Sequence, residues 1–471
     1  MHNKHLAQIN FNDIDYEIDK LPLKKSRSSR NRPTPWFYRY NNLNPDKKVI
    51  VIGGGISGAT TAYSLAKRGY TVTLYEKNSE LAAEASGNYQ AILYGSFSAD
   101  NTPIQELSLS GYRYSHDLIR KFLDEQAQEY QQCGLVQLAL NQADLNKQQK
   151  LIASKCLPDD FCQLMDAKQI SKMAGIETSN HNGLYFPYGL WLNPVILIKK
   201  LCSHPNIKVI TNTNIDDLIQ LENNSWDIIS NSQIIDNAAN VVLCNAHAVN
   251  KFSVTEHLAI RKIRGQISIA SGNLGLKTIL CANGYITPNR GDKYTIGATF
   301  NFKELHTDVT EADHIENLAM ANQILSNSSQ KIDASNLSGQ ANIRVSSYDY
   351  MPLTGPIANH EIFKQTYAKL SQDSNYWLED ECPYYKGLFV NIAHGAKGML
   401  TAPICGEIIA SFIDNTQLTV SEVLRKALHP NRIYVRDLVK NNCNYKKKTE
   451  EDALKLRHTS DDKEWDDFSF E

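Results

Sequence analysis

The feature that most constrains the fold is a glycine-rich turn that joins an apolar strand to a helix. The apolar run KVIVI at Lys48–Ile52 is followed by GGGISG, in which Gly53, Gly55 and Gly58 are spaced as GxGxxG. A second apolar run, TVTLY, ends at Glu76, eighteen residues after Gly58. A strand, a glycine turn, a helix and a second strand with an acidic end form the context that a dinucleotide-binding motif requires. We therefore predict an α/β domain that binds a dinucleotide at this turn.

The glycines and the acid have separate physical roles in such a turn. Gly53 makes the tight bend, Gly55 lets the backbone approach a pyrophosphate, and Gly58 lets the helix pack closely on the strand. The start of the helix offers free N–H groups and partial positive charge to phosphates. Glu76 would accept hydrogen bonds from an adenosine ribose, and its charge disfavours a 2′-phosphate, so FAD or NAD fits better than NADP. The other contacts predicted around this turn are Ile56, Ser57 and Lys77.

Composition and charge exclude several classes of protein. The chain has 471 residues, with 49 Lys and Arg against 51 Asp and Glu, which excludes a uniformly basic nucleic-acid binder but not a local basic patch. Its nine cysteines are odd in number and include no CxxC pair, which argues against a disulfide framework and a thiolate zinc site. No uninterrupted apolar stretch approaches the ~20 residues of a membrane helix, and the N-terminus has no secretory h-region. We expect a cytoplasmic protein with no metal site and no membrane partner.

The alternation of strand and helix patterns predicts two domains between two polar ends. The expected fold class is α/β, with a Rossmann-like FAD-binding domain and an inserted antiparallel-sheet substrate domain. The predicted segments are a polar basic arm at 1–45, the discontinuous FAD-binding domain at 46–102, 183–262 and 342–438, the substrate domain at 103–182 and 263–341, and a charged, disordered tail at 439–471. The main predicted elements are strands at 48–53, 71–76, 208–210, 216–222, 226–230, 233–235 and 241–243, and helices at 56–69, 104–129, 194–203 and 402–413.

Two further polar segments favour FAD over NAD. The first holds Ser86, Gly87, Asn88 and Gln90, which form either an ordinary polar loop or a turn against the pyrophosphate and the flavin edge. The second, LFVNIAHGAKGM, is again a strand, a glycine turn and a helix. A second helix N-terminus would point at the flavin N1–C2=O edge, which becomes anionic on reduction. The contacts predicted there are Gly395, Lys397, Gly398 and Met399, although Lys397 is also consistent with a solvated loop lysine.

Together these segments resemble the D-amino-acid oxidase and glycine oxidase superfamily of flavoproteins. The likeness is closer to one branch, the FAD oxidoreductase part of the bifunctional tRNA 5-methylaminomethyl-2-thiouridine biosynthesis proteins, and it covers about residues 35–438. It is carried by Pro35-Trp36-Phe37, by ASGNxQ ending at Gln90, by GLYFPYGLWLNP ending at Pro194, and by PNR ending at Arg432.

The resemblance implies an FAD-dependent oxidoreductase that acts on CH–NH donors. Such an enzyme removes the carboxymethyl group of 5-carboxymethylaminomethyl-(2-thio)uridine at the wobble position of the tRNA anticodon loop, leaving 5-aminomethyluridine and glyoxylate. Residues 1–34 contain no glycine and offer no counterpart of the methyltransferase part of these proteins. We therefore expect the reaction to stop at the aminomethyl product, so that any later methylation falls to a separate methyltransferase.

The resemblance also implies two catalytic residues. A fixed cation must hold the substrate carboxylate, and the planar fork of an arginine suits this role. Arg344, in NIRVSSYDYMPLTG, matches an arginine that takes this role in related flavoproteins, and Tyr285, in GYITP, matches a tyrosine placed over the substrate. The plainer alternatives are a structural salt bridge and a packing tyrosine. His247 and His394 are not accompanied in the sequence by other potential metal ligands, and we interpret them as structural residues or as neighbours of the flavin.

Two other classes of protein stay open at this stage. One is a flavoprotein oxidase or dehydrogenase of free glycine, sarcosine or D-amino acids, and the other is a dinucleotide-binding protein without catalysis. Binding of tRNA phosphates needs only a local basic surface, the alternative being that the charges are merely solvated. The candidate cations are Lys24, Lys25, Arg27, Arg30, Arg32, Arg261, Lys262 and Arg264.

Overall fold

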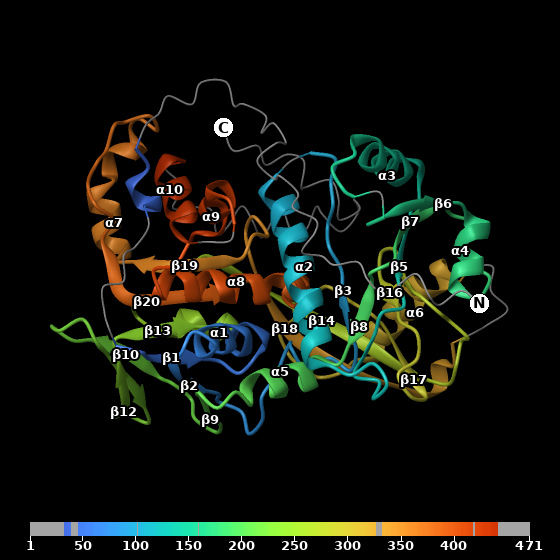
Figure 1. Ribbon diagram of the computed structural model, residues 1–471, viewed down its shortest axis with the longest axis horizontal. Helices are drawn as coiled ribbons and strands as arrows, with labels where there is room; N and C mark the ends of the chain where they lie inside the picture. The colour runs from blue at the N-terminus through green and yellow to red at the C-terminus, as the bar shows by residue number, and fades with distance from the viewer. Residues whose placement is uncertain are drawn as a thin grey trace.

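The computed structural model describes residues 33–38, 46–100, 102–158, 160–325, 332–417 and 420–440. The predicted basic cluster between Lys24 and Arg32 and the predicted tail beyond residue 440 lie outside these ranges. Figure 1 shows one large sheet in each half of the molecule, with the long helix α2 (Pro103–Phe122) between them.

The first half is built on a six-stranded sheet. Its strands are parallel except for β19, which pairs antiparallel with β20 at the edge. Parallel strands joined by helices are the arrangement predicted for a dinucleotide-binding domain. In spatial order the strands are β19 (Leu353–Ala358), β20 (Tyr384–Ile392), β13 (Asn240–Leu243), β1 (Lys48–Ile52), β2 (Thr71–Tyr75) and β9 (Ile207–Ile210).

Both faces of this sheet are covered because strand β1 is apolar on both sides. Val49 and Val51 pack into a core shared with helices α1, α2, α5 and α8, whereas Ile50 and Ile52 pack into a second core with Trp226. The helices of the first core are α1 (Ile56–Ala66), α5 (Pro194–Cys202) and α8 (Gly398–Ile413) together with α2. The second core lies under a small sheet of β10 (Asp217–Gln220), β11 (Trp226–Ser230) and β12 (Gln233–Ala238), and under helices α7 (His360–Thr366) and α10 (Asn431–Val439).

The second half is built on an eight-stranded sheet, which is antiparallel except for the parallel pair β15–β5. Its two longest strands, β14 and β18, pair along almost their whole length. In spatial order the strands are β18 (Leu337–Ser347), β14 (Ile260–Ser271), β17 (Lys293–Gly297), β16 (Tyr285–Ile286), β15 (Ile279–Cys281), β5 (Leu135–Leu138), β7 (Gly183–Phe186) and β6 (Gln163–Met165). Another small sheet consists of β3 (Ala91–Leu93), β8 (Leu190–Leu192) and β4 (Tyr130–Gln131). The remaining helices are α3 (Gln142–Ser154), α4 (Ala167–Ala174), α6 (Glu311–Ile324) and α9 (Glu422–Leu428). The short 3-10 helices are η3 (Pro35–Phe37), η4 (Ala246–Lys251), η5 (Ala334–Asn336), η6 (Ala368–Ser371) and η7 (Gly395–Lys397).

The fold class predicted from the sequence is confirmed, but some element ends differ. The predicted helix at 104–129 ends at Phe122, because Leu123 is extended and the Asp124 carboxylate accepts a hydrogen bond from the Gln126 amide. Helix α8 begins four residues before its predicted start at 402. The division into two domains remains a proposal, and within it the strand at 183–186 belongs to the eight-stranded sheet rather than to the FAD-binding domain in which it was predicted.

One segment within the described ranges is long and apolar enough to cross a membrane. It runs from Gly395 to Ile413 and consists of η7 and α8. The fold buries 83% of it, because α8 packs between α1 and α2 in the first core. The length and composition of this helix are therefore explained by its place in the core.

The two ends of the described chain meet on the surface of the second core. The buried Trp36 carbonyl accepts hydrogen bonds from Tyr384 (3.0 Å) and Asn431 (2.9 Å). Arg432 forms a bidentate ion pair with Asp349, with both N–O distances at 2.8 Å. These contacts show that the PWF and PNR segments are anchors of the fold.

Candidate functional site

The glycine turn after β1 has the geometry that requires glycine. Gly53 has φ = +112°, and a methyl group on it would lie 2.6 Å from the Cys244 carbonyl oxygen. A methyl group on Gly58 would lie 1.8 Å from the Gly53 carbonyl oxygen. A methyl group on Gly55 would meet only Ser86 Oγ, at 3.0 Å. Gly53 and Gly58 therefore shape the turn, whereas Gly55 leaves the outer side of the turn free for a ligand.

The predicted acid stands at the end of β2 beside this turn. Glu76 is buried and accepts hydrogen bonds from the Gly54 amide at 2.7 Å and from the Asn78 amide and side chain at 2.8 and 2.7 Å. A carboxylate has about four acceptor positions, so these bonds orient it without using all of them. Lys77, the next residue, forms an ion pair with Glu84 at 2.5 Å.

The turn opens into a pocket whose lining fits a dinucleotide. Asn245 lines this pocket, and its buried Oδ1 has no hydrogen-bond partner within the described part of the chain. The same holds for the buried Nδ1 of His247, which lies in sequence between the lining residues Ala246 and Ala248. The sequence analysis did not select Asn245, although its place just after the parallel strand β13 is where such folds bind ligands. The pocket is lined by residues 52–57, 75–78, 82–86, 213–215, 244–246, 248 and 343.

The segment at 84–93 closes one side of this pocket and is fixed to the other half of the molecule. Ser86 Oγ accepts a hydrogen bond from the Ile56 amide at the start of α1, at 3.0 Å. Gln340, on β18, accepts from the Tyr89 amide at 2.8 Å and donates to the Gly87 carbonyl at 3.1 Å. The predicted Ser-Gly-Asn turn therefore lies at the start of α1 and is held by a residue of the eight-stranded sheet.

Gln90 is placed differently from the prediction that it contacts the cofactor. Its side chain is fully buried and donates to the Pro288 carbonyl at 3.0 Å. It also accepts hydrogen bonds from Thr287 at 2.9 Å and from Thr295 at 3.1 Å. Because every polar atom of this amide is engaged away from the pocket, Gln90 ties the segment to the eight-stranded sheet.

The second glycine turn lies beside the first. A methyl group on Gly398, the first residue of α8, would lie 3.5 Å from Ile56 Cγ2, so the starts of α1 and α8 are adjacent. Met399 follows in the first turn of α8 and packs on the first core. The Lys397 ammonium donates a hydrogen bond to Ser96 Oγ and lies 5.7 Å from the Tyr94 ring centroid, so it is an ordered lysine and not a freely solvated one.

His394 precedes the second turn as a neutral structural residue. Its two ring nitrogens lie 2.9 Å from Thr401 Oγ1 and 3.1 Å from Asn391 Oδ1. Burial lowers the pKa of His394 to about 3, so the ring is uncharged at neutral pH. Within the described ranges no three His, Cys, Asp or Glu side chains come together as a metal-binding group.

Arg344 and Tyr285 lie on the same face of the eight-stranded sheet. Tyr285 pairs with Gly297, Gly297 with Ile267, and Ile267 with Gln340, which lies four residues before Arg344 on β18. Because side chains alternate along a strand, residues in such a row and at even spacing share a face. The strand β18 then runs on to Ser346, which bridges His394 at the second glycine turn. The face of β18 that carries Arg344 thus leads to the second glycine turn.

Among the described residues, the structure shows no ion-pair partner for the charge of Arg344. No hydrogen bond or ion pair joins its guanidinium to another residue in the described part of the chain, although Tyr285 acts on it electrostatically. Burial lowers the pKa of Arg344 from its usual value, but an arginine stays protonated in proteins. Burial raises the pKa of Tyr285 to about 12, and the charge of Arg344 opposes this shift, so the phenol is neutral and can donate a hydrogen bond. A partly buried cation with no partner among the described residues, beside a phenol that can donate a hydrogen bond, can bind an anion such as a carboxylate.

The other candidate cations have different surroundings. Arg264 is fully buried and pairs with Asp313 at 2.6 Å, so the prediction that it could contact phosphates is wrong. Arg261 stacks over Tyr348, with its guanidinium carbon 4.6 Å from the ring centroid. Lys262 is exposed. Of these three side chains, only that of Lys262 is exposed, and that of Arg261 is half-buried.

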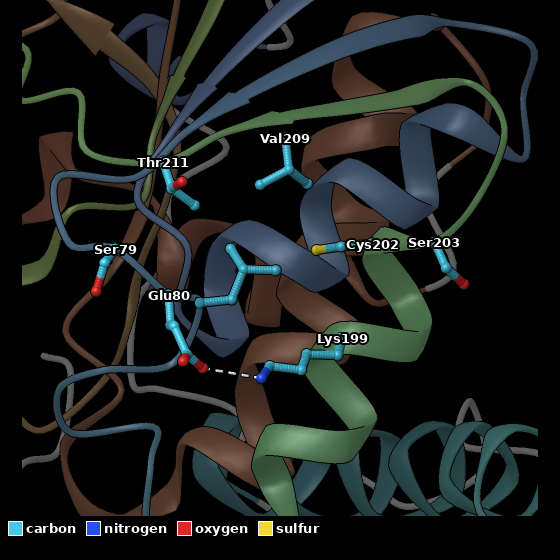
Figure 2. Close-up of a pocket in the computed structure, with 8 residues that line it drawn as sticks. Ser79, Glu80, Lys199, Cys202, Ser203, Val209 and Thr211 are labelled. Atoms are coloured by element: carbon cyan, nitrogen blue, oxygen red, sulfur yellow. Dashed lines mark hydrogen bonds and ion pairs between the residues drawn. The ribbon is translucent and has the colours of Figure 1, made fainter.

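A second hollow lies away from these residues. Figure 2 shows it between the loop after β2 and helix α5, where Glu80 and Lys199 form an ion pair of 2.9 Å across one side. It is open and mostly apolar, and it contains none of the predicted site residues. The dinucleotide pocket and the Arg344 face therefore remain the candidate site.

Comparisons with known proteins identify the family of this chain. Residues 48–412 match the family described as "DAO: FAD dependent oxidoreductase". The chain is 37% identical over 427 residues to the tRNA 5-methylaminomethyl-2-thiouridine biosynthesis bifunctional protein MnmC of Chromobacterium violaceum, covering 89% of this chain and 63% of that protein. It is 35% identical over 414 residues to MnmC of Pseudomonas savastanoi pv. phaseolicola, covering 86% and 62%. The chain thus spans a little over three fifths of the length of these relatives.

Solved structures show the same fold. Glycine oxidase from Geobacillus kaustophilus has a TM-score of 0.64 and 18% sequence identity, covering 82% of this chain and 98% of that one. L-proline dehydrogenase from P. horikoshii also has a TM-score of 0.64, with 16% identity over 83% of this chain and 98% of that one. The family match, the glycine turns and the pocket identify FAD as the cofactor. The chain belongs to the DAO family of FAD dependent oxidoreductases.

Proposed function

We propose that this chain removes the carboxymethyl group of 5-carboxymethylaminomethyl-(2-thio)uridine at the tRNA wobble position, giving 5-aminomethyluridine and glyoxylate. The observation that carries the proposal is the Arg344 guanidinium, which has no partner among the described residues and lies beside the neutral Tyr285 on the sheet face that leads to the second glycine turn. The carboxymethylamino group ends in a carboxylate, which is the anion that an arginine fork binds best. The relatives that match over most of this chain are named for tRNA 2-thiouridine biosynthesis, which supports a tRNA substrate.

The cofactor would be held at the two adjacent helix starts. The turn from Gly53 to Gly58 and the start of α1 would receive the pyrophosphate, and Glu76 would bond the adenosine ribose. The Ser86–Asn88 turn and the Gly395–Met399 turn would border the flavin. When bound there, FAD would supply the oxidising power for the reaction, which removes two electrons from the substrate as one hydride equivalent.

The side chains of this protein would prepare the substrate for that oxidation. Arg344 would hold the carboxylate through two parallel hydrogen bonds and fix the neighbouring carbon in one place. Tyr285 would stay protonated and donate to the same carboxylate. Oxidation of the carbon–nitrogen bond gives an imine of glyoxylate, and water then cleaves it to the primary amine and glyoxylate. No side-chain nucleophile is needed.

The tRNA would approach as an anticodon loop, whose unstacked bases can be read individually. Arg261 and Lys262 would face its phosphates, and the reaction would take place in the cytoplasm. A separate methyltransferase activity would act on the aminomethyl product.

The test is a spectral titration of the purified chain. Anaerobic addition of tRNA that carries the carboxymethylaminomethyl group should bleach the visible flavin absorption, because the bound FAD is reduced. Fully demodified tRNA is the matched control and should leave the spectrum unchanged. Bleaching by free glycine, sarcosine or D-amino acids, with none by tRNA, would replace the proposal with an amino-acid oxidase.

A further inference from the structure

Two aromatic side chains, the exposed Phe300 and the half-buried Phe302, lie on the loop that joins β17 to α6. Phe300 is 40% exposed, and its ring packs edge to face on Phe302 with the centroids 5.1 Å apart. Two more apolar side chains of this loop, Leu305 and Val309, are each 45% exposed. Exposed apolar side chains lose favourable burial, so several of them on one loop indicate a binding surface.

The loop passes directly beside the carboxylate-binding cation. A methyl group on Gly265 would lie 2.5 Å from Arg344 Nη2 and 2.8 Å from the Thr299 carbonyl oxygen. Both atoms therefore lie close to Gly265, and Phe300 is the residue that follows Thr299. The aromatic pair consequently stands at the rim of the site that Arg344 defines.

Hydrogen bonds from Arg264, on β14, hold this loop in place. Arg264 is fully buried and donates to the His306 and Asp308 carbonyls at 2.9 and 2.7 Å. It also exchanges two backbone hydrogen bonds of 2.8 Å with Asn301, the residue between the two phenylalanines. Because these contacts already order the loop, its rings would lose little conformational freedom on binding.

The charges on the loop leave one cation free. Glu304 and Asp308 lie 3.8 and 3.5 Å from the two ring nitrogens of His306. Lys303, next to Phe302, is exposed and has no ion-pair partner within the described ranges. An aromatic pair with an adjacent lysine matches the combination of stacking and phosphate attraction that binds single-stranded nucleic acid.

We propose that Phe300 and Phe302 form a stacking platform for the unpaired anticodon bases that flank the substrate nucleotide. The inference rests on the proposed tRNA function and names the part of the site that selects tRNA over a free amino acid. A small amino acid held by Arg344 would gain nothing from exposed rings at the rim, whereas a splayed anticodon loop offers bases to each of them.

The test compares a large and a small substrate. The large one is an anticodon stem–loop that carries the modified wobble uridine and a 2-aminopurine beside it, whose fluorescence is quenched on stacking. The small one is the free nucleoside 5-carboxymethylaminomethyluridine. The variants are Phe300→Ala with Phe302→Ala, Phe300→Trp as the conservative change, and Leu305→Ala as the matched control, since Leu305 is an equally exposed apolar residue of the same loop.

The double alanine variant should raise KM for the stem–loop roughly 5- to 150-fold and abolish the quench, as expected for loss of base stacking. Its turnover of the free nucleoside and its flavin content should stay at the wild-type level. Phe300→Trp and Leu305→Ala should behave like the wild type.

Unchanged stem–loop binding in the double variant would overturn the proposed stacking platform but not the proposed function. If the double variant lost activity equally with the free nucleoside, the loop would act as a lid over the site. If Leu305→Ala lost as much stem–loop binding as the double variant, the contact would be a general apolar one. Either result would overturn the inference. Wild-type protein that leaves the stem–loop unmodified would overturn the proposed function itself.

Discussion

Gly265 and Arg344 meet across the antiparallel pair β14–β18, and a methyl group on Gly265 would lie only 2.5 Å from Arg344 Nη2. The guanidinium therefore occupies the space that any other residue at position 265 would fill. Because Gly265 has no side chain, β14 leaves room for the Arg344 guanidinium of β18. The position of this guanidinium in turn defines where a substrate carboxylate can bind.

Gly265→Ala should lower kcat/KM through Arg344 while the fold survives. The methyl group would push the flexible end of the arginine, and a displacement approaching 1 Å can cost about 10²-fold in rate. Steady-state kinetics with modified tRNA measure the loss, and flavin content and thermal unfolding serve as controls. Wild-type kinetics would mean that the guanidinium adopts another position when the substrate is bound.

Arg344→Ala should leave FAD bound but strongly impair removal of the carboxymethyl group. Loss of a charge-assisted hydrogen bond to a buried carboxylate costs about 2–5 kcal/mol, or roughly 30- to 4000-fold in kcat/KM. Arg344→Lys should recover only part of the activity, since an ammonium group cannot reproduce the planar fork. Near-normal turnover in Arg344→Ala would show that another cation holds the substrate.

Gly58→Ala should give protein without bound flavin. Its new methyl group would lie 1.8 Å from the Gly53 carbonyl oxygen, a backbone contact that cannot relax without opening the turn. The flavin-to-protein ratio of the purified variant, compared with that of the wild type, measures the loss. A wild-type ratio would contradict the role assigned to Gly58.

Glu407 should make the protein sensitive to acid. Burial alone would raise the pKa of this α8 carboxyl, but hydrogen bonds from Arg68 and Lys67 lower it to about 2. The folded pKa is below the unfolded value of about 4.5, so this stabilisation is complete above pH 4.5 and is lost as the pH falls toward 2. A shift of this size corresponds to about 3 kcal/mol at neutral pH.

Glu407→Gln should therefore be less stable than the wild type at pH 7, and the difference should narrow as the pH falls below 4.5. Denaturant unfolding at a series of pH values measures this convergence. Parallel stability curves for the two proteins, with a constant difference at every pH, would show that the carboxyl does not carry the effect.

The dinucleotide half of the site could be predicted from the sequence because its signals are local. The turn from Gly53 to Gly58 and the acid at Glu76 lie within one βαβ unit, where spacing alone determines the geometry. Helix α5 was also predicted closely, since Asn193 caps it and Pro194 begins it.

The substrate half could not be derived from spacing in the same way. Arg344 and Tyr285 are brought together by a register that runs through β18, β14, β17 and β16, and such long-range pairing leaves no local pattern. Gln90 shows the opposite error, because it lies in a motif-like segment yet has its amide turned into the protein interior. The role of Gly265 depends on a side chain on the neighbouring strand, so the sequence alone gives no sign of it.

The central claim is that Arg344 holds the carboxylate of a modified tRNA wobble uridine for oxidation. Its most direct test is mass spectrometry of nucleosides from modified tRNA after incubation with wild-type protein and with Arg344→Ala, with glyoxylate measured in the same reactions. The account predicts conversion to 5-aminomethyluridine with one glyoxylate per nucleoside for the wild type, and at most a small fraction of this rate for the variant. An unchanged wobble nucleoside with the flavin-loaded wild type, or equal conversion by both proteins, would contradict it.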